Sequence, residues 1–491
     1  MKKSHINSSL QSLILNLSKY KNFGILGFGK EGKSFLDFLL NNNKKQYLEI
    51  NKIIIFDKFL TQEKLNLYLK ENRIFNYKNI ILFSGESYKE NFSQADIIIK
   101  APGISCFHEK ISDKDIKKYN ITSLSDLFLN FFGHQTIGIT GTKGKSTTAS
   151  LLFHLFQKSE KYNKNSNNSV FIVGNIGKPV FEIVNDINEN SIIIHEFSSH
   201  QLEKITVGPR IAVLLNLFPE HLDYYENKDK YFEAKYNIFK ILEKNTETNM
   251  RNGRDYISIE NKKFTVSNII NKRSKKYFIN DFDNFKDFEN KKNFNFLEKI
   301  QNISVHSDTV QVVKIISDIY NLFSENDFIK NINNFKSLPH RLELLNFVDN
   351  QKNKNILFIN DSISTIPEST IEGIKSVQIL EKMQNKKLDF LILGGFDRGV
   401  CLKSLVDFVE NRDIKNIFLT AQTGKILKKL FKTSTTKNII YKEKLEDIIF
   451  LVKKEASSNS VCLFSPSASS FDEYKNFEER GDVFKKIVKN I

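Results

Sequence analysis

Residues 138–148 read GITGTKGKSTT, and this stretch decides the class of fold. The apolar residues 136–139 before it predict a buried strand, and residues 149–153 after it predict the start of a helix. A glycine-rich turn between a strand and a helix presents backbone N–H groups to phosphate oxygens. Lys145 would add a positive charge at the outer phosphates, and Ser146 would offer a hydroxyl to Mg²⁺. The alternative is an ordinary strand–helix turn, but the Lys–Ser pair favours nucleotide binding.

The size and composition of the chain indicate a multidomain globular protein. Its 491 residues exceed one ordinary domain, and 40% of them are hydrophobic. No apolar run reaches the length of a membrane span, and the N-terminus lacks a signal-peptide pattern. The three cysteines are far apart, so neither a disulfide framework nor a zinc site is expected. We therefore expect a cytoplasmic protein with no membrane partner.

The net charge of +16 raises the alternative of a nucleic-acid-binding protein. The lysines are dispersed along the chain, however, and no basic block stands alone. This distribution favours a chain that is generally rich in lysine, whose charge helps to capture anionic substrates. We expect no nucleic-acid partner.

Apolar runs alternate with helical patterns along the whole chain, which predicts an α/β fold with parallel sheets. Three domains are expected. Residues 1–133 would form a Rossmann-like domain, residues 134–337 a central domain with the phosphate loop, and residues 338–491 a second Rossmann-like domain.

A second glycine motif, Gly27, Gly29 and Gly32, follows the predicted strand at residues 23–26, and Asp57 follows the next strand. This is the spacing of a dinucleotide fingerprint, which on its own suggests NAD and an oxidoreductase. The helix N-terminus attracts any pyrophosphate, however, so another diphosphate compound fits equally.

The spelling of residues 138–148 resembles the phosphate loop of the Mur ligases and of their relatives, the folylpolyglutamate synthetases. Further motifs carry the resemblance from Gly27 to Gly481, and the last of them is similar to the D-glutamate-adding Mur ligases. They are KAPGI at residues 100–104, VGNIG at 173–177, HEFSSHQLE at 195–203, NLFPEHLDYY at 216–225, YFEAK at 231–235, LPHRLE at 338–343, NDSIST at 360–365, GGFDRG at 394–399 and SPSASSFDEYKNFEERG at 465–481.

The resemblance implies roles for individual residues. The ATP-binding residues would be Gly141, Thr142, Lys143, Gly144, Lys145, Ser146, Thr147, Asn175, Arg341 and Asp361. The catalytic residues would be Lys145, Glu196, His221, Lys235 and Arg341. Two Mg²⁺ ions would be held by Ser146, Glu196, His221 and Lys235, the lysine after carbamylation. The UDP-sugar would contact Gly27, Gly29, Gly32, Asp57, Pro102 and Gly103, and the amino acid Thr365, Arg398, Ser470 and Phe477.

The chain departs from the family pattern at two places. Ile363 stands where the family often has lysine, which removes one polar contact. In residues 301–313 only Asn302 and His306 are imperfect counterparts of the family's adenine-site residues.

The resemblance implies a monomeric, ATP- and Mg²⁺-dependent ligase of peptidoglycan synthesis. Its substrates would be UDP-N-acetylmuramoyl-L-alanine and D-glutamate, joined through an acyl phosphate. The nearest alternatives are a sister Mur ligase and a folylpolyglutamate synthetase. The alternatives of another class are the NAD oxidoreductase and the nucleic-acid-binding protein.

Overall fold

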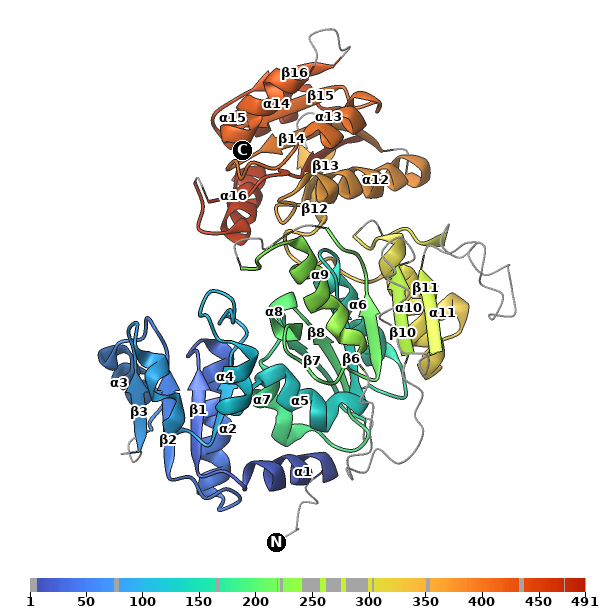
Figure 1. Cartoon of the computed structure of the whole chain (residues 1–491). Coiled ribbons are helices and arrows are strands. Elements are labelled where there is room, and N and C mark those ends of the chain that lie inside the picture. Colours follow the sequence, from blue (N-terminus) through green and yellow to red (C-terminus); the bar gives the residue numbers. More distant parts are fainter. Residues whose placement is uncertain are drawn as a thin grey trace. The chain divides into compact units, whose positions relative to one another are not determined.

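The structure is a computed structural model, and it describes residues 7–74, 79–163, 168–218, 220, 224–240, 257–261, 275–279, 299–302, 304–349, 354–384, 386–431, 437–471 and 473–490. The chain forms two compact units. The first comprises Met1–Asn290 and Gln311–Phe323, and the second comprises Lys291–Val310 and Ser324–Ile491. The first unit contains two parallel sheets, and the second contains one mixed sheet (Figure 1).

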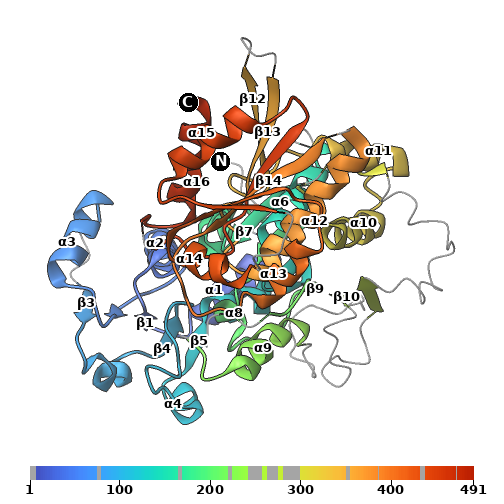
Figure 2. The same cartoon turned by 90° about the horizontal axis from the view of Figure 1, so that it is seen from above.

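The first sheet has five parallel strands in the order β3-β2-β1-β4-β5, with β1 and β4 side by side (Figure 2). The strands are β1 (Asn22–Leu26), β2 (Lys52–Phe56), β3 (Ile80–Phe83), β4 (Ile97–Lys100) and β5 (Ile121–Ser123). The direction of winding changes between β1 and β4. Open parallel sheets bind their ligands at the carboxyl ends of the strands at such a point.

Both faces of this sheet are covered, which explains why β2 is apolar throughout. Ile53 and Ile55 belong to one buried cluster, and Ile54 and Phe56 belong to another. Strands buried on both faces read as continuous apolar runs. The helices of this part are α1 (Ser8–Leu17), α2 (Lys30–Lys44), α3 (Gln62–Glu71), η1 (Tyr88–Gln94), α4 (Asp113–Lys118), α5 (Leu124–Phe132) and η2 (Gly133–Gln135).

The second sheet has six parallel strands in the order β11-β10-β9-β6-β8-β7, with β6 near its centre. The strands are β6 (Thr136–Thr140), β7 (Val170–Gly174), β8 (Ile192–Glu196), β9 (Ile211–Leu214), β10 (Ile257–Asn261) and β11 (Lys275–Ile279). The helices are α6 (Lys145–Lys158), α7 (Val180–Ile183), η3 (Val184–Asp186), α8 (Ser199–Leu202), α9 (Lys228–Tyr236), η4 (Asn237–Phe239) and α10 (Ser307–Tyr320).

The sheet of the second unit has the order β12-β13-β17-β14-β15-β16. Its strands are β12 (Glu343–Asp349), β13 (Lys354–Asn360), β14 (Lys387–Gly394), β15 (Asn416–Thr420), β16 (Asn438–Tyr441) and β17 (Ser460–Phe464). One face packs against α12 (Pro367–Gln384), α13 (Lys403–Glu410) and α14 (Ala421–Leu430), and the other against α15 (Leu445–Glu455) and α16 (Phe477–Asn490). The remaining helix is α11 (Glu325–Asn333).

The predicted α/β fold class is confirmed, and the structure adds elements that the sequence did not indicate. Strand β12 pairs antiparallel with β13, although only parallel sheets were predicted. No element was predicted at residues 257–279, where strands β10 and β11 lie. Helix α6 ends at Lys158, and residues 164–167 beyond it lie outside the described residues.

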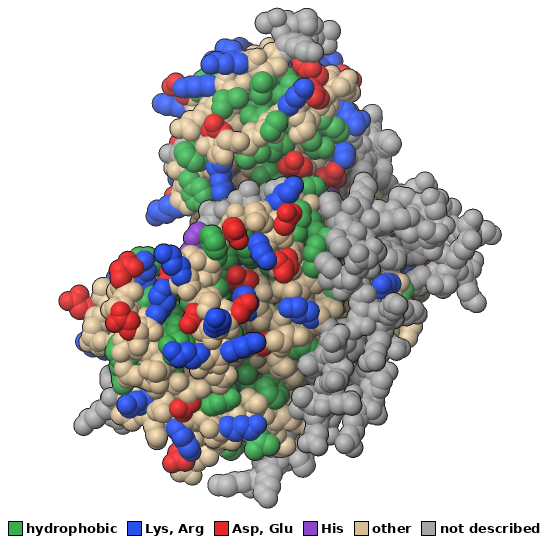
Figure 3. Space-filling model, in the orientation of Figure 1, with side chains coloured by type: hydrophobic (Ala, Val, Ile, Leu, Met, Phe, Trp, Pro, Cys, Tyr) green, Lys and Arg blue, Asp and Glu red, His purple; other side chains and the backbone are tan. Residues whose placement is uncertain are grey.

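The surface agrees with a dispersed charge. On the face drawn in Figure 3, Lys and Arg side chains are interspersed with Asp and Glu. Among the helices in the described part of the chain, none is long and apolar enough to cross a membrane.

Candidate functional site

The phosphate loop lies between the central strand β6 and helix α6, as its sequence predicted. Gly141 and Gly144 have φ angles of +150° and +84°, a region that favours glycine, and Gly144 caps α6. The buried side chains of Ser146 and Thr147 lie in the first turn of α6. The free N–H groups at the start of this helix therefore face the same turn that carries the lysines.

The two lysines of the loop are held in different ways. Lys143 Nζ forms an ion pair with Glu220 Oε1 at 2.8 Å. Lys145 Nζ donates to the carbonyl oxygens of Gly141 and Thr142, both at 2.9 Å. Lys145 is thus drawn across the loop, where a phosphate oxygen competes well with neutral carbonyls because it carries charge.

Lys235 lies at the same turn and is almost fully buried, with 2% of the residue exposed. Helix α9 places its Nζ 2.8 Å from the carbonyl oxygen of Gly141 and 4.9 Å from the centre of the Tyr231 ring. Burial, assisted by the charge of Lys145, lowers the pKa of Lys235 well below its ordinary value. A larger share of the amine is therefore neutral near pH 7, which is the form that reacts with CO₂.

Glu196 ends β8, next to the phosphate loop, and its side chain is fully buried. Asn175 Nδ2 donates to Glu196 Oε1 at 3.3 Å, whereas Oε2 has no hydrogen-bond partner among the described residues. A buried carboxylate oxygen without a partner is costly. A divalent cation would satisfy it, so the oxygen donors present here fit Mg²⁺.

A set of contacts that the sequence did not reveal braces the phosphate loop. Thr142 Oγ1 accepts from the backbone N–H of Phe218 at 2.9 Å and lies 3.1 Å from Tyr231 Oη. Asn216 Oδ1 accepts from the N–H of Lys143 at 2.8 Å, and Asn216 Nδ2 donates to the Lys143 carbonyl at 3.1 Å. The segment after β9 thus fixes the loop. Only the presence of Asn216 in a family motif signalled this role.

The first glycine-rich turn follows β1 and resembles the phosphate loop in its backbone. Gly27 has a φ of +91°, and a Cβ on Gly32 would lie 2.2 Å from the Gly27 carbonyl oxygen. Asp57 accepts hydrogen bonds from three backbone N–H groups, those of Phe28 at 2.8 Å, Phe59 at 2.9 Å and Leu60 at 3.0 Å. The structure therefore brings Asp57 to this turn, where its carboxylate fixes the backbone.

The start of α2, directly after the first turn, also contacts helix α8, which follows β8 of the second sheet. Gln201 Nε2 donates to Glu31 Oε1 at 2.7 Å, while Gln201 Oε1 accepts from the N–H of Ser198 in the capping box of α8. Burial raises the pKa of Glu31. Pro102 and Gly103 follow β4, the neighbour of β1, so they lie at the point where the winding of the first sheet reverses.

The candidate residues of the second unit gather around Asp361, which follows β13 and is buried. Its Oδ2 accepts from Ser364 Oγ at 2.6 Å and from Ser465 Oγ at 2.8 Å. Burial raises the pKa of Asp361 to about 6, and these hydrogen bonds oppose the rise. Asp361 is thus a buried carboxyl group with hydroxyl groups as its hydrogen-bond partners.

Arg480 organises this cluster, although the sequence suggested no role for it beyond its place in a motif. The residue is 3% exposed. Its guanidinium donates to the Ser469 carbonyl at 2.9 Å, the Ser362 carbonyl at 2.7 Å and Ser362 Oγ at 3.0 Å. Ser362 Oγ in turn donates to the carbonyl oxygen of Phe477 at 2.9 Å. The segment that carries Ser470 and Phe477 is thereby tied to Ser362, which lies 115 positions before Phe477.

The remaining candidates are placed less closely. Thr365 follows Ser364, whose carbonyl accepts from the N–H of Ser467, and Arg398 follows β14 and is exposed. Arg341 is half-buried, and its charge opposes the rise that burial causes in the pKa of Asp361. His221 lies outside the described residues.

The weak counterparts of the adenine site have structural partners within the second unit. Asn302 Nδ2 donates to the carbonyls of Ile332 at 2.9 Å and Phe335 at 2.7 Å. His306 Nδ1 lies 3.0 Å from Ser376 Oγ.

A phosphate loop on a central parallel strand, with a buried lysine and carboxylate beside it, defines a nucleotide-dependent enzyme of the α/β class. Comparison with known proteins specifies the family. The model of the Mur ligase middle domain matches residues 139–316. A UDP-N-acetylmuramoylalanine--D-glutamate ligase of Buchnera aphidicola is 30% identical over 96% of this chain and 99% of its own length. One of Clostridium acetobutylicum is 28% identical over 96% and 97%.

The chain belongs to the Mur ligase family, and the resemblance stated from its motifs is confirmed. Among solved structures, the UDP-N-acetylmuramoylalanyl-D-glutamyl-2,6-diaminopimelate--D-alanyl-D-alanyl ligase of Acinetobacter baumannii is 11% identical with a TM-score of 0.49. That alignment covers 99% of this chain and 98% of the other.

Proposed function

We propose that this chain is an ATP-dependent ligase that joins D-glutamate to UDP-N-acetylmuramoyl-L-alanine in peptidoglycan synthesis. The observation that carries the proposal is the group of Lys145, Lys235 and Glu196 around one phosphate loop. A buried lysine and a carboxylate oxygen without a partner suit phosphoryl transfer. The D-glutamate ligases of Buchnera aphidicola and Clostridium acetobutylicum, which match nearly the whole chain, support the choice of substrates.

The reaction would proceed in two steps. An oxygen of the alanyl carboxylate attacks the γ-phosphorus of ATP, so that ADP leaves and an acyl phosphate forms. The amine of D-glutamate then attacks the acyl carbon and loses a proton, and phosphate departs with one former carboxylate oxygen. Lys145 and the N–H groups at the start of α6 would stabilise the charge on the phosphoryl oxygens in the first step.

The residues beside the loop fit a magnesium site. Mg²⁺ would neutralise charge on the phosphate oxygens. Glu196 offers a buried oxygen without a hydrogen-bond partner, and Ser146 offers a hydroxyl. A carbamate on Lys235 would add two anionic oxygens. The low pKa of this lysine supports that modification, since CO₂ adds to the neutral amine.

The first glycine-rich turn would hold the diphosphate of the UDP-sugar. Its backbone has the tight geometry of a diphosphate site, and Asp57 already accepts from three backbone N–H groups. In an NAD site this carboxylate binds the ribose hydroxyls. The engagement of Asp57 with the backbone favours the UDP-sugar over NAD.

The second unit would supply the amino-acid site. Arg480 holds Ser362 and the turn that carries Ser470 in place, and Phe477 lies at the same cluster. Thr365 and Arg398 would complete the recognition of the two carboxylates of D-glutamate.

Phosphate release from ATP with UDP-N-acetylmuramoyl-L-alanine tests this function. D-glutamate should stimulate release, whereas L-glutamate, L-alanine and diaminopimelate should not. Stimulation by another amino acid would identify a sister ligase. Reduction of NAD by a substrate, without any release of phosphate, would identify the oxidoreductase.

A further inference from the structure

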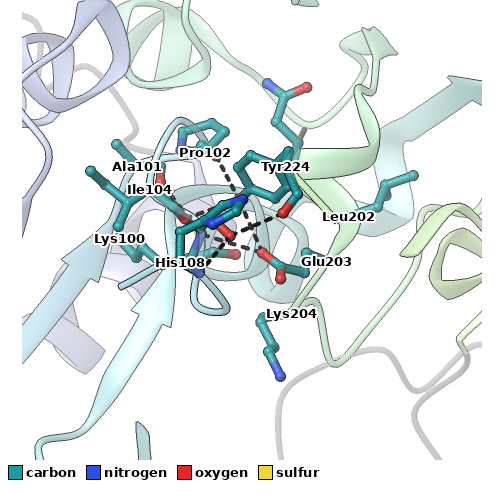
Figure 4. Close-up of polar contacts among 12 residues, drawn as sticks. Lys100, Ala101, Pro102, Ile104, His108, Leu202, Glu203, Lys204 and Tyr224 are labelled. Carbon is teal, nitrogen blue, oxygen red and sulfur yellow. Dashed lines mark hydrogen bonds and ion pairs between the residues drawn. The ribbon is translucent and has the colours of Figure 1, made fainter. Parts of the chain in front are cut away.

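Lys100 is a buried lysine that no step of the proposed reaction uses. It is the last residue of β4, and its side chain is 2% exposed. Its Nζ donates to the carbonyl oxygens of Ile104 at 2.8 Å and Ala101 at 3.5 Å, and it lies 3.8 Å from Glu203 Oε2 (Figure 4). A buried ammonium is tolerated only with such partners, so these contacts fix the turn at residues 101–104.

Tyr224 approaches the same groups from the segment that follows β9 (Figure 4). Its hydroxyl oxygen lies 3.0 Å from the Ile104 carbonyl, 3.2 Å from the Pro102 carbonyl and 3.2 Å from Glu203 Oε2. A phenol has a single proton, so it donates to one of these acceptors at a time. Two of them, the Ile104 carbonyl and Glu203, are the groups that Lys100 also contacts.

The Lys100–Glu203–Tyr224 network joins three segments of the first unit. Lys100 precedes the turn at residues 101–104, Glu203 directly follows α8, and Tyr224 lies between β9 and α9. That segment also contains Glu220, the ion-pair partner of Lys143. The ring centre of Tyr225 lies 4.9 Å from that of Tyr224 and 5.6 Å from that of Tyr231, whose hydroxyl is 3.1 Å from Thr142 Oγ1. A chain of contacts therefore runs from the turn at residues 101–104 to the phosphate loop.

We propose that the Lys100–Glu203–Tyr224 network holds the turn at residues 101–104, a predicted part of the UDP-sugar site, in register with the phosphate loop, so that the acceptor carboxylate meets the transferring phosphoryl group. Its three members are positioning residues. This inference rests on the proposed function, because only a reaction between two bound substrates needs the two sites aligned. Small misplacements of reacting groups have large effects on rate.

A neighbouring ion pair provides a matched control. Lys204 Nζ lies 3.0 Å from Asp113 Oδ1, and this pair also links the first sheet's helices to the end of α8. Its side chains are 38% and 83% exposed, and neither contacts the turn at residues 101–104 through the bonds described above. An exposed pair contributes little to rigidity because water competes for it.

The test compares Tyr224→Phe, Glu203→Gln, Lys100→Met and the control Lys204→Met in the full-length chain. Tyr224→Phe keeps the ring, which lies 4.0 Å from the ring of His200, and removes only the hydroxyl. Glu203→Gln keeps an acceptor oxygen for Tyr224 and removes the charge opposite Lys100. For each variant, kcat for D-glutamate-dependent phosphate release is measured. The dissociation constants of UDP-N-acetylmuramoyl-L-alanine and of a non-hydrolysable ATP analogue, each alone, are measured beside it.

We expect Tyr224→Phe and Glu203→Gln to lower kcat about tenfold, while each dissociation constant stays within about twofold. Lys204→Met should keep kcat within about twofold. Thermal unfolding of each variant gives the folded fraction, and kcat is corrected for it. A loss that disappears after this correction would make the network merely structural and overturn the inference.

Two further results would contradict it. If Lys204→Met lowered kcat as much as Tyr224→Phe, the rate would depend on general packing between the two sheets and not on this network. If Lys100→Met weakened only the binding of the UDP-sugar alone, Lys100 would be a ligand-contacting residue. A wild-type chain without D-glutamate-dependent release would refute the proposed function and this inference with it. An active wild type beside a fully active Tyr224→Phe would refute the inference alone.

Discussion

The two glycine-rich turns of the first unit share a backbone design and differ in the charges around them. Each follows a central parallel strand, opens a helix and contains a glycine with positive φ. Three lysines, Lys143, Lys145 and Lys235, lie at the phosphate loop, together with Glu196 and Glu220. The first turn has two acidic residues close to its backbone, Glu31 and Asp57, and the charges of Lys30 and Lys100 act on Glu31.

This difference separates binding from chemistry. Backbone N–H groups at a helix start suffice to hold a diphosphate. Transfer of a phosphoryl group needs additional positive charge that meets the transition state. We therefore expect the first turn to bind its nucleotide without reacting with it. The phosphate loop should catalyse phosphoryl transfer from its nucleotide.

The largest expected effect is that of Lys145→Ala. Loss of its charge on the phosphoryl group should lower ligation by about 1000-fold or more, with the fold intact. Binding of the UDP-sugar alone should not change, since Lys145 lies at the other turn. The comparison variant is Lys158→Ala, at the exposed far end of α6, which should retain activity. A folded Lys145→Ala enzyme with near-normal turnover would refute the assignment of this loop to ATP.

Lys235→Ala comes next, with an expected loss of about 100-fold. If a carbamate on this residue is a metal ligand, added acetate should restore part of the activity by supplying oxygens. Lys230→Ala, on the exposed side of the same helix, is the control and should remain active. Rescue by an amine in place of acetate would indicate a plain cation near phosphate. An active Lys235→Ala enzyme would contradict both roles.

Gly32→Ala should disrupt the backbone of the first turn and leave the phosphate loop unchanged. The new Cβ would lie 2.2 Å from the Gly27 carbonyl oxygen, so backbone must shift. Affinity for the UDP-sugar should fall about tenfold or more, and the affinity for the ATP analogue should hold. Calorimetry with UDP-sugar, NAD and the ATP analogue measures which of these affinities the substitution changes.

Gly29→Ala controls for the effect of Gly32→Ala on stability, because a Cβ at Gly29 meets no atom within 4 Å. Only the Gly32→Ala chain should have a lowered unfolding midpoint. Equal unfolding midpoints, with UDP-sugar affinity unchanged, would contradict the tight-turn account. NAD binding in place of UDP-sugar binding would favour the oxidoreductase.

The smallest expected effect is that of Glu31→Gln. A diphosphate next to an ionised Glu31 is repelled, so the amide should raise UDP-sugar affinity by about two- to fivefold at pH 8. Burial raises the pKa of Glu31, so its protonation begins above the ordinary value of 4.5 as the pH falls. The difference between variant and wild type should shrink in that direction. Affinity titrations from pH 8 to pH 5 would show it, and a gap that widens at low pH would contradict this reading.

The fold class and the phosphate loop could be predicted because they depend on local patterns. An apolar run, a glycine turn and a helix occupy residues 136–158 without interruption, so neighbouring residues determine the geometry. The antiparallel strand β12 was missed because the predicted pattern of alternating strands and helices assumed parallel pairing throughout.

The roles that were missed depend on contacts between residues far apart in sequence. Arg480 and Ser362 are 118 positions apart, and Lys100, at the end of β4, meets Glu203, which directly follows α8. Burial of Lys235 was not readable from α9, whose sequence is polar overall. Its role was expected only through the family resemblance. The structure adds the low pKa and the contact with Gly141 that such a role would need.

The central claim is that the alanyl carboxylate is activated by phosphorylation, and an oxygen-labelling measurement tests it most directly. UDP-N-acetylmuramoyl-L-alanine carrying ¹⁸O in its carboxylate is incubated with ATP, Mg²⁺ and D-glutamate, and the released phosphate is analysed by mass. An acyl phosphate transfers one carboxylate oxygen to phosphate, so one ¹⁸O atom should appear in the phosphate for each amide formed. Ligation with unlabelled phosphate, or release of phosphate that does not depend on D-glutamate, would contradict the account.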